Sequence, residues 1–274
     1  MADTDKSMPL GGHLEELRHR LLLVVIVMGV VFTVCMFFYR EIWTLAMLPR
    51  ERAAAWVGET ADKLFPLQFM RPLEGLSSAV GIAFKTAVGL TLPLILAQLW
   101  LFVAPALTPR EKRSFRWVAG GGSVLFFTGA ALAFLYAVPT GLGYLAEFDR
   151  TLDATVTQWR VDAYLDFVFT ACLGFGLGFE LPLVMAALTG VGLLTPERII
   201  KYWRHTVLAL TVCGAVFTPP DPYTMIFLSG CLIILYLMGY ALSLWVARAG
   251  NPAAASQPPA AEEEFSGGCE EDEL

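Results

Sequence analysis

Long uncharged stretches alternate along this chain with short segments that carry most of its Lys, Arg, Asp and Glu residues. A helix needs about 20 apolar residues to cross a bilayer core of about 30 Å. Stretches of this kind predict six helical spans, at 21–39, 80–104, 117–138, 164–194, 206–218 and 223–247. The fifth has only about 13 residues, so we expect it to cross a locally thinned bilayer or to lie against partners that cover the mismatch.

The composition supports a membrane protein. Hydrophobic residues make up 56% of the 274 residues and charged residues 16%, with a mean hydropathy of +0.60, which is too apolar for a water-soluble domain. The ten-residue alternation of a transmembrane β-barrel is absent from the sequence. We therefore predict an all-α polytopic protein with a six-helix transmembrane domain over residues 1–250, placed in the lipid bilayer and without a nucleic-acid partner.

Basic residues in the short loops predict the orientation. Four lie in 105–116 and three in 195–205, whereas 40–76, 139–163 and 219–222 hold five, two and none, which is fewer for their length. Because Lys and Arg are enriched in cytoplasmic loops, we expect the first two loops and both termini to be cytoplasmic. Residues 251–274, with seven acids and no Lys or Arg, are expected to form a disordered acidic tail on that side.

The motifs of membrane-embedded enzymes are missing from the sequence. "HLEEL" lacks the second His of a zinc-protease helix, "GGGSV" at 120–124 lacks the final Gly of a nucleophile elbow, and no Walker-type phosphate loop occurs. Three His and five scattered Cys residues give no metal or redox spacing. We therefore expect a protein that is not an enzyme and that holds no cofactor or metal.

Two acidic residues lie beside the predicted cytoplasmic ends of the first spans. Glu16 precedes the first span, and Glu111 is the only acidic residue of the basic, proline-containing loop 105–116. Two carboxylates on one membrane face suit a pair of arginines, because a guanidinium binds a carboxylate through two parallel hydrogen bonds. The simpler alternative is that Glu16 pairs with Arg20, four residues on, and that Glu111 balances its basic neighbours.

Glu180 lies deep in the fourth predicted span, within "GFGLGFELPLV", where an ionisable group costs about 2.5 to 3.5 kcal/mol to insert. It must face protein or water. Two interpretations stay open, a protonated hydrogen-bonding group that locks the helix or a hydrated functional site. Gly174, Gly176 and Gly178 would allow a neighbouring helix to approach closely. Lys85 is expected to extend to the outer surface without a chemical role.

In their order and spacing, these motifs resemble the TatC family, the signal-peptide receptor subunits of the twin-arginine protein translocase. The resemblance covers roughly residues 8–247 and is carried by "HLEELRHRL" (13–21), "LPLILAQLWLFVAPAL" (92–107) followed by Glu111, "FGLGFELPL" (175–183), "TPERI" (195–199) and "TPPD" (218–221).

The resemblance implies a receptor of the bacterial cytoplasmic (inner) membrane that has no reaction of its own. It would bind twin-arginine signal peptides of folded cargo at the cytoplasmic face and organise export driven by the proton-motive force. Its implied partners are TatA- and TatB-type single-span subunits and further copies of itself, and its helices would form a concave wall. The matching positions are Glu16 and Glu111 for signal-peptide binding, Arg18, Arg20, Phe102 and Pro105 in support of that face, Glu180 inside the membrane, and Pro49 and Asp221 in the outer loops.

The last span departs from the family pattern. Related proteins often have Gln, Pro and Glu where this chain has Met225, Cys231 and Leu237, which puts polar docking of a partner helix in doubt. Packing through Ser229 and Gly230 could replace it. Two other functions stay open beside the resemblance, a proton-coupled small-molecule transporter that uses Glu180 and a scaffold that only assembles other subunits. Asp221 has a simpler alternative role as a helix cap.

Overall fold

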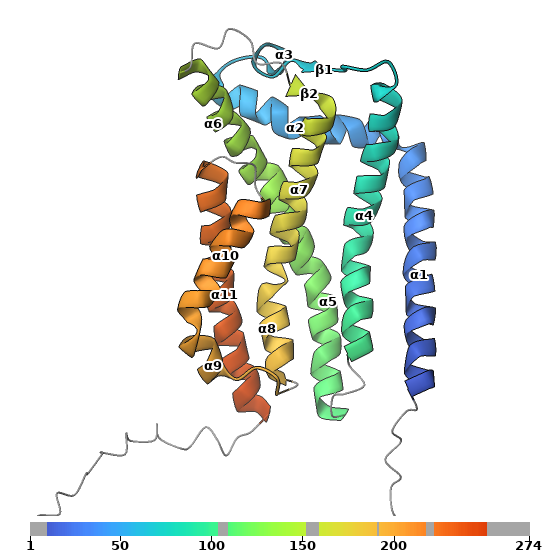
Figure 1. Ribbon diagram of the computed structural model, residues 1–274, viewed down its shortest axis with the longest axis vertical. Coiled ribbons are helices and arrows are strands. Elements are labelled where there is room, and N and C mark those ends of the chain that lie inside the picture. The colour runs from blue at the N-terminus through green and yellow to red at the C-terminus, as the bar shows by residue number, and fades with distance from the viewer. Residues whose placement is uncertain (1–9, 104–108, 152–158, 191, 218–221, 251–274) are drawn as a thin grey trace, which may run out of the picture.

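Long helices standing side by side dominate the structure (Figure 1). The computed structural model describes residues 10–103, 109–151, 159–190, 192–217 and 222–250. Within these residues, five helical stretches are long and apolar enough to cross a membrane: Leu17–Phe37, Glu74–Leu99, Gly121–Asp149, Val161–Gly190 and Thr224–Arg248. The all-α polytopic prediction is therefore confirmed.

The first helix begins and the last helix ends at the same end of the molecule (Figure 1). The elements are, in chain order, α1 (Leu10–Phe37), α2 (Tyr39–Val57), α3 (Ala61–Leu64), β1 (Leu67–Gln68), α4 (Glu74–Val103), α5 (Pro109–Leu132), η2 (Ala133–Ala137), α6 (Val138–Thr151), β2 (Trp159–Arg160), α7 (Val161–Phe179), α8 (Leu181–Gly190), α9 (Pro196–Lys201), α10 (Trp203–Phe217) and α11 (Pro222–Gly250). Helices α1 and α5 begin, and α11 ends, at the lower end of Figure 1, which we call the inner end. We call the opposite end, where α2 lies, the outer end.

The predicted fifth span corresponds to α10, which has 15 residues. At 1.5 Å per residue this helix is about 22 Å long, shorter than a bilayer core. The expectation of an unusually short helix is confirmed, and its crossing of the membrane stays a prediction. The six-span count, the concave wall, the cytoplasmic placement of both termini and the boundary of the transmembrane domain at residue 250 stay predictions too, and the acidic tail lies outside the described residues.

Helix α2 corrects the expectation of a loop over 40–76. It lies across the outer end, nearly perpendicular to the spans (Figure 1). Met47, Ala53 and Ala54 are buried along it at helical spacing, while Arg40 and Arg52 are exposed. Gly58 ends the helix with φ of 77°, a left-handed conformation that glycine adopts without steric cost. A search for long uncharged runs misses such a helix, because its polar face interrupts every run.

The third span is also longer than predicted. The helix expected to end at 138 continues through the π-helical segment η2 and along α6 to Thr151. Pro139, which is buried, has no N–H to donate to the turn before it, and a wider π turn accommodates that loss. The Thr140 hydroxyl donates to the carbonyl of Tyr136 at 2.7 Å and satisfies a group in the same turn.

Two outer segments are tied together above α4 and α7. Strands β1 and β2 pair in parallel, with Leu67 opposite Trp159. Phe65 is buried beneath them, with its ring edge-on to that of Trp159 at 5.4 Å. The Tyr164 hydroxyl donates to the carbonyl of Ala46 at 2.7 Å, which connects α7 to α2. The outer end is thus covered by a layer that shares one hydrophobic core with α4, α6 and α7.

Candidate functional site

The inner end carries the two acidic positions predicted to bind arginines. Glu16 lies in the second turn of α1 and Glu111 in the first turn of α5. Both helices begin at the inner end, and α4 packs against each of them (Figure 1). The structure describes the backbones of Glu16, Glu111 and Phe102 but not their side chains, and Pro105 lies outside the described residues.

Two basic residues of α1 lie beside Glu16. Arg18 is exposed, whereas Arg20 is half-buried and donates through Nη1 to Oε1 of Gln98 on α4 at 3.2 Å. Gln98 falls within the "LPLILAQLWLFVAPAL" stretch, but nothing in the spacing of the sequence indicates its contact with a residue 78 positions earlier. The sequence analysis missed it for that reason.

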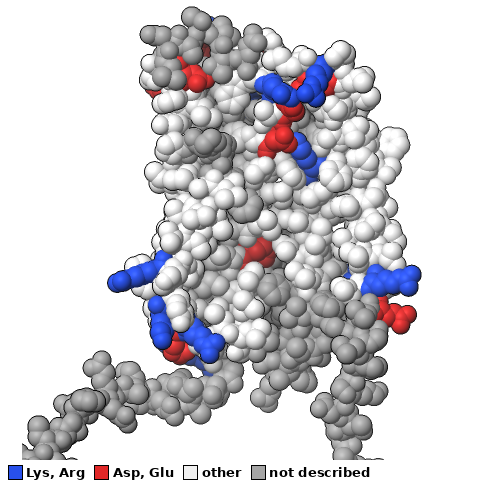
Figure 2. Space-filling model, viewed as in Figure 1, with Lys and Arg blue, Asp and Glu red and all other residues white. Residues whose placement is uncertain are grey.

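The second inner loop is held by a tyrosine of the last helix. Tyr236 of α11 is buried, and its hydroxyl donates to the carbonyl of Ile199 in α9 at 2.7 Å. The basic residues nearby, Arg198, Lys201 and Arg204, are exposed. Figure 2 shows basic side chains toward the inner end on this face of the molecule.

Glu180 interrupts the fourth predicted span, which divides into α7 and α8. At this break the N–H of Glu180 donates to the carbonyl of Leu177, three residues earlier, at 3.1 Å. Pro182, two residues on, has no N–H and donates no helical hydrogen bond. The Glu180 side chain is 4% exposed. Neither carboxyl oxygen has a hydrogen-bond partner among the described residues, so the locking interpretation lacks the bond that it requires.

Space for this carboxyl group comes from a glycine of α5. A Cβ atom on Gly122 would lie 2.9 Å from Oε2 of Glu180 and 3.1 Å from Oε1. The close approach expected of the α7 glycines is confirmed at Gly176, where a Cβ atom would lie 2.5 Å from the ring of Phe126. Burying a carboxyl group without a partner is costly unless water satisfies its oxygens. Among the described residues, Glu180 is thus a buried carboxyl group without a protein partner.

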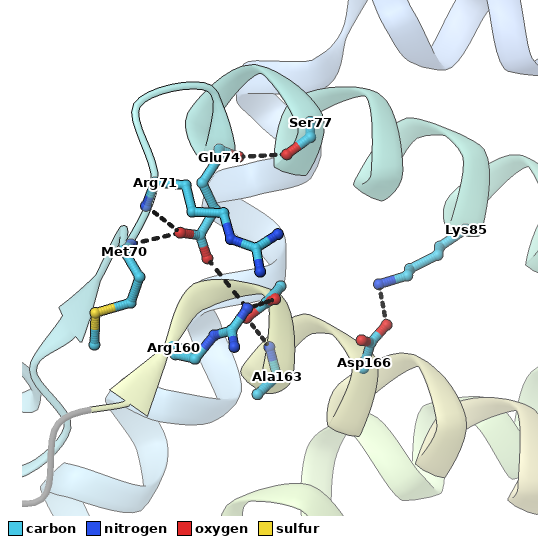
Figure 3. A network of polar contacts seen from close by, with 9 residues as sticks. Met70, Arg71, Glu74, Ser77, Lys85, Arg160, Ala163 and Asp166 are labelled. Atoms are coloured by element: carbon cyan, nitrogen blue, oxygen red, sulfur yellow. Dashed lines mark hydrogen bonds and ion pairs between the residues drawn. The ribbon is translucent and has the colours of Figure 1, made fainter.

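Charged residues near the outer end form a network that the sequence analysis did not anticipate (Figure 3). One oxygen of the buried Glu74 accepts the backbone N–H groups of Met70 and Arg71. Its other oxygen lies 4.0 Å from Nη2 of Arg160. The first two contacts order the turn that starts α4, and the third brings Arg160, the residue before α7, to ion-pair distance.

The expectation for Lys85 was wrong. Its side chain is 24% exposed and pairs with Asp166 of α7 instead of extending alone to the outer surface. Figure 3 shows the two side chains pointing toward each other across the gap between α4 and α7. A carboxylate within reach removes the need for the ammonium group to reach bulk water.

The proline and aspartate predicted in the outer loops have different outcomes. Pro49 is fully buried in the middle of α2, not in a loop. Its position there, without an N–H to donate, is consistent with a structural role. Asp221 lies outside the described residues.

Two small residues of α11, Ser229 and Gly230, were expected to pack against a partner helix in place of polar docking, and this stays a prediction. Ser229 is buried against α10, where a Cβ atom on Gly214 would lie 2.5 Å from its Oγ, so it packs inside the chain. Gly230 has open space around it. Of the three departures, Met225 and Cys231 are half-buried and Leu237 is 59% exposed.

Together these features define a polytopic helical membrane protein with a basic inner end, an acidic residue buried inside a span, and a covered outer end. Among the described residues, no group of three His, Cys, Asp or Glu side chains could hold a metal ion. The class is therefore a multi-pass helical membrane protein.

Comparisons with known proteins identify the family. The sequence model described as "Sec-independent protein translocase protein (TatC)" matches residues 12–230. TatC of Helicobacter pylori strain J99 is 33% identical over 241 residues, which is 88% of this chain and 89% of that protein. TatC of Synechocystis is 32% identical over 238 residues, covering 86% and 87% of the two chains. This chain belongs to the TatC family.

A solved structure agrees with this assignment. The crystal structure described as the twin arginine translocase receptor TatC in DDM superposes with a TM-score of 0.72 at 28% identity, covering 84% of this chain and 99% of that one. The chain is therefore a multi-pass subunit of a Sec-independent protein translocase in the bacterial inner membrane. Nothing in the comparisons supports the alternative of a small-molecule transporter.

Proposed function

We propose that this chain is the signal-peptide receptor of its translocase and has no reaction of its own. It binds the twin-arginine signal peptides of folded cargo at the inner end, which is cytoplasmic. Glu16 and Glu111 each accept one guanidinium group through paired hydrogen bonds. The observation that carries the proposal is that α1 and α5, which bear these residues, begin at the same end and both pack against α4.

The chemistry of the inner end favours an arginine ligand. In sequence, Glu16 lies close to Arg18 and Arg20, and Glu111 lies between Arg110 and Lys112, so each carboxylate has positive charges as near neighbours. A ligand with two guanidinium groups displaces these basic side chains from the carboxylates only if it makes better hydrogen bonds to them. The planar guanidinium makes two parallel bonds to a carboxylate, whereas an ammonium group acts as a single point charge.

Site-specific crosslinking and equilibrium binding of a twin-arginine signal peptide test this proposal. Exposed ion pairs contribute about 0 to 1 kcal/mol and desolvated bidentate pairs several. We expect Glu16→Ala and Glu111→Ala each to weaken binding about tenfold or more, equivalent to about 1.4 kcal/mol. High salt should weaken wild-type binding only in part, since sheltered pairs are screened less.

Two neighbouring acids provide matched controls. Glu15→Ala removes an exposed carboxylate from the adjacent position of α1, and Glu197→Ala removes one from α9. Both variants should bind the peptide as the wild type does. Undiminished crosslinking in the Glu16→Ala/Glu111→Ala double variant would refute the proposal, as would an equal loss in the Glu15→Ala control.

Export then requires the other subunits and the proton-motive force. We propose that TatA- and TatB-type single-span subunits dock along α10 and α11, that several copies of this chain form the receptor complex, and that Glu180 serves the passage of cargo. The apolar Leu237 on the exposed face of α11 favours packing over polar docking. Copurification of small single-span proteins from mild detergent, and its loss in Leu237→Arg, tests the docking face.

A further inference from the structure

Helix α1 is anchored to the rest of the molecule near its outer end. Cys35 is 4% exposed and packs with Ala83 and Ala87 of α4, and Val31, Phe32 and Met36 adjoin the same cluster. The ring of Phe32 also lies edge-on to that of Phe84, with centroids 6.1 Å apart. All these contacts of α1 lie within its last seven residues.

The inner half of the same helix packs less closely, with Val24, Val27 and Met28 only half-buried. None of its described residues from Leu17 to Val30 is buried, and only 6% of the span is buried in the molecule. Leu21, Val25 and Ile26 are more than half exposed. Apolar packing therefore fixes the outer end of α1 far better than the inner end, where Glu16 lies.

A polar contact compensates in the inner half. Arg20 reaches across to Gln98 of α4, with Nη1 3.2 Å from Oε1. Gln98 is half-buried, which shelters this hydrogen bond from water. Its position five residues before the end of α4 also puts it on the helix that leads to α5 and Glu111.

We infer that Gln98 is a positioning residue of the signal-peptide site, which sets the separation of Glu16 and Glu111 by holding Arg20 against α4. The inference rests on the proposed function. Cys35 lies 19 residues beyond Glu16, about 28 Å along the helix axis, so a tilt of about 10° around the outer anchor displaces Glu16 by about 5 Å. A displacement of that size exceeds the reach of a hydrogen bond, and one peptide could then no longer engage both carboxylates.

The amide suits this role better than a carboxylate would. Its oxygen accepts a hydrogen bond from the guanidinium without neutralising it, and it adds no third negative charge to the site. Arg20 thus keeps its charge while its position is fixed.

Spin-label distances test the role of Gln98 in a full-length background that keeps the buried Cys35 of the outer anchor and replaces the other four Cys residues. One label pair, at Leu21 and Leu99, reports the inner ends of α1 and α4, and a second pair, at Val34 and Val80, reports the outer anchor; all four side chains are exposed. We expect Gln98→Leu to broaden the inner distance distribution and leave the outer one unchanged. Gln98→Glu should keep the inner distribution narrow, because a carboxylate also accepts from Arg20.

Peptide binding in the same variants links the position to recognition. Gln98→Leu should weaken binding of a twin-arginine peptide about five- to tenfold, and a disulfide engineered between the inner ends of α1 and α4 should restore it. Gln68→Leu removes an exposed amide from β1 and should change neither measurement. An inner distribution that stays narrow in Gln98→Leu, or full affinity despite a broad one, would overturn the inference. Failure of the wild type to bind the peptide would instead refute the proposed function, and the distances would still be measured independently.

Discussion

The crossing of α5 over α7 depends on a glycine that leaves no room for a side chain. A Cβ atom on Gly129 would lie 2.6 Å from the carbonyl oxygen of Phe175 and 2.7 Å from Cγ of Phe179. The first neighbour is backbone and the second is the fixed end of a ring, so neither can move aside alone. Gly129→Ala should therefore push α5 away from α7, close to the turn that carries Glu180.

Gly121 of the same helix provides a control that separates the cost of overpacking at Gly129 from the gain in helix propensity. It has nothing within 4 Å of a Cβ position. Replacing Gly by Ala inside a helix contributes about 0.5 to 1 kcal/mol of stability, and this gain is common to both variants. Overpacking costs about 1 to 3 kcal/mol. Gly129→Ala should thus unfold more easily than Gly121→Ala by about 1 to 3 kcal/mol.

Unfolding in mixed micelles, followed by circular dichroism as the SDS fraction rises, measures the difference in the free energy of unfolding. Comparing the two variants with each other removes the helix-propensity contribution, which comparison with the wild type does not. Equal stabilities would show that α5 and α7 do not touch at Gly129, and the described environment of Glu180 would then be wrong as well.

Three further predictions concern contacts elsewhere in the chain. Glu180→Leu should raise the free energy of unfolding by about 1 to 3 kcal/mol, because it removes a buried carboxyl group without a partner, while export of a twin-arginine reporter is lost; a less stable variant would contradict this reasoning. Tyr164→Phe should destabilise by about 1 to 2 kcal/mol through loss of the bond to the Ala46 carbonyl, whereas the exposed Tyr136→Phe should be neutral in the same SDS titration. Lys85→Met should be more destabilising than Lys85→Met combined with Asp166→Asn, since the single change leaves a carboxylate unpaired; additive effects in a double-mutant cycle would exclude a coupled pair.

The sequence was informative where a single local property decides the structure. Runs of apolar residues predicted the long spans, and the isolated charge of Glu180 marked a buried acidic position inside the fourth. Helix α2 was missed because its polar face breaks every apolar run, although Met47 and Ala53–Ala54 recur at a spacing typical of a half-buried helix. The continuation of the third span to Thr151 was missed because the apolar run gives way to polar residues after 138, and the π turn that continues the helix has no signature in the sequence.

Contacts between distant residues could not be predicted in the same way. Lys85 and Asp166 are 81 positions apart, and Arg20 and Gln98 are 78. A solitary lysine in a span is compatible with reaching for the surface or with a partner on another helix, and only the packing of α4 against α7 decides between them. The role of Gly122 could not be predicted for the same reason, because it depends on the packing that brings Glu180 against it.

The π turn at Ala133–Ala137 also constrains how this region can change. Before it, Gly122, Phe126 and Gly129 contact α7 and α8; after it, Val138, Leu142 and Ala146 belong to the core beneath α2. One helical residue corresponds to about 100° of rotation, so deleting a single residue here would turn the second set out of that core while leaving the first in place. An insertion or deletion in this stretch would therefore rotate the whole of α6 about its axis. We expect the length of the segment to be preserved even where its side chains vary.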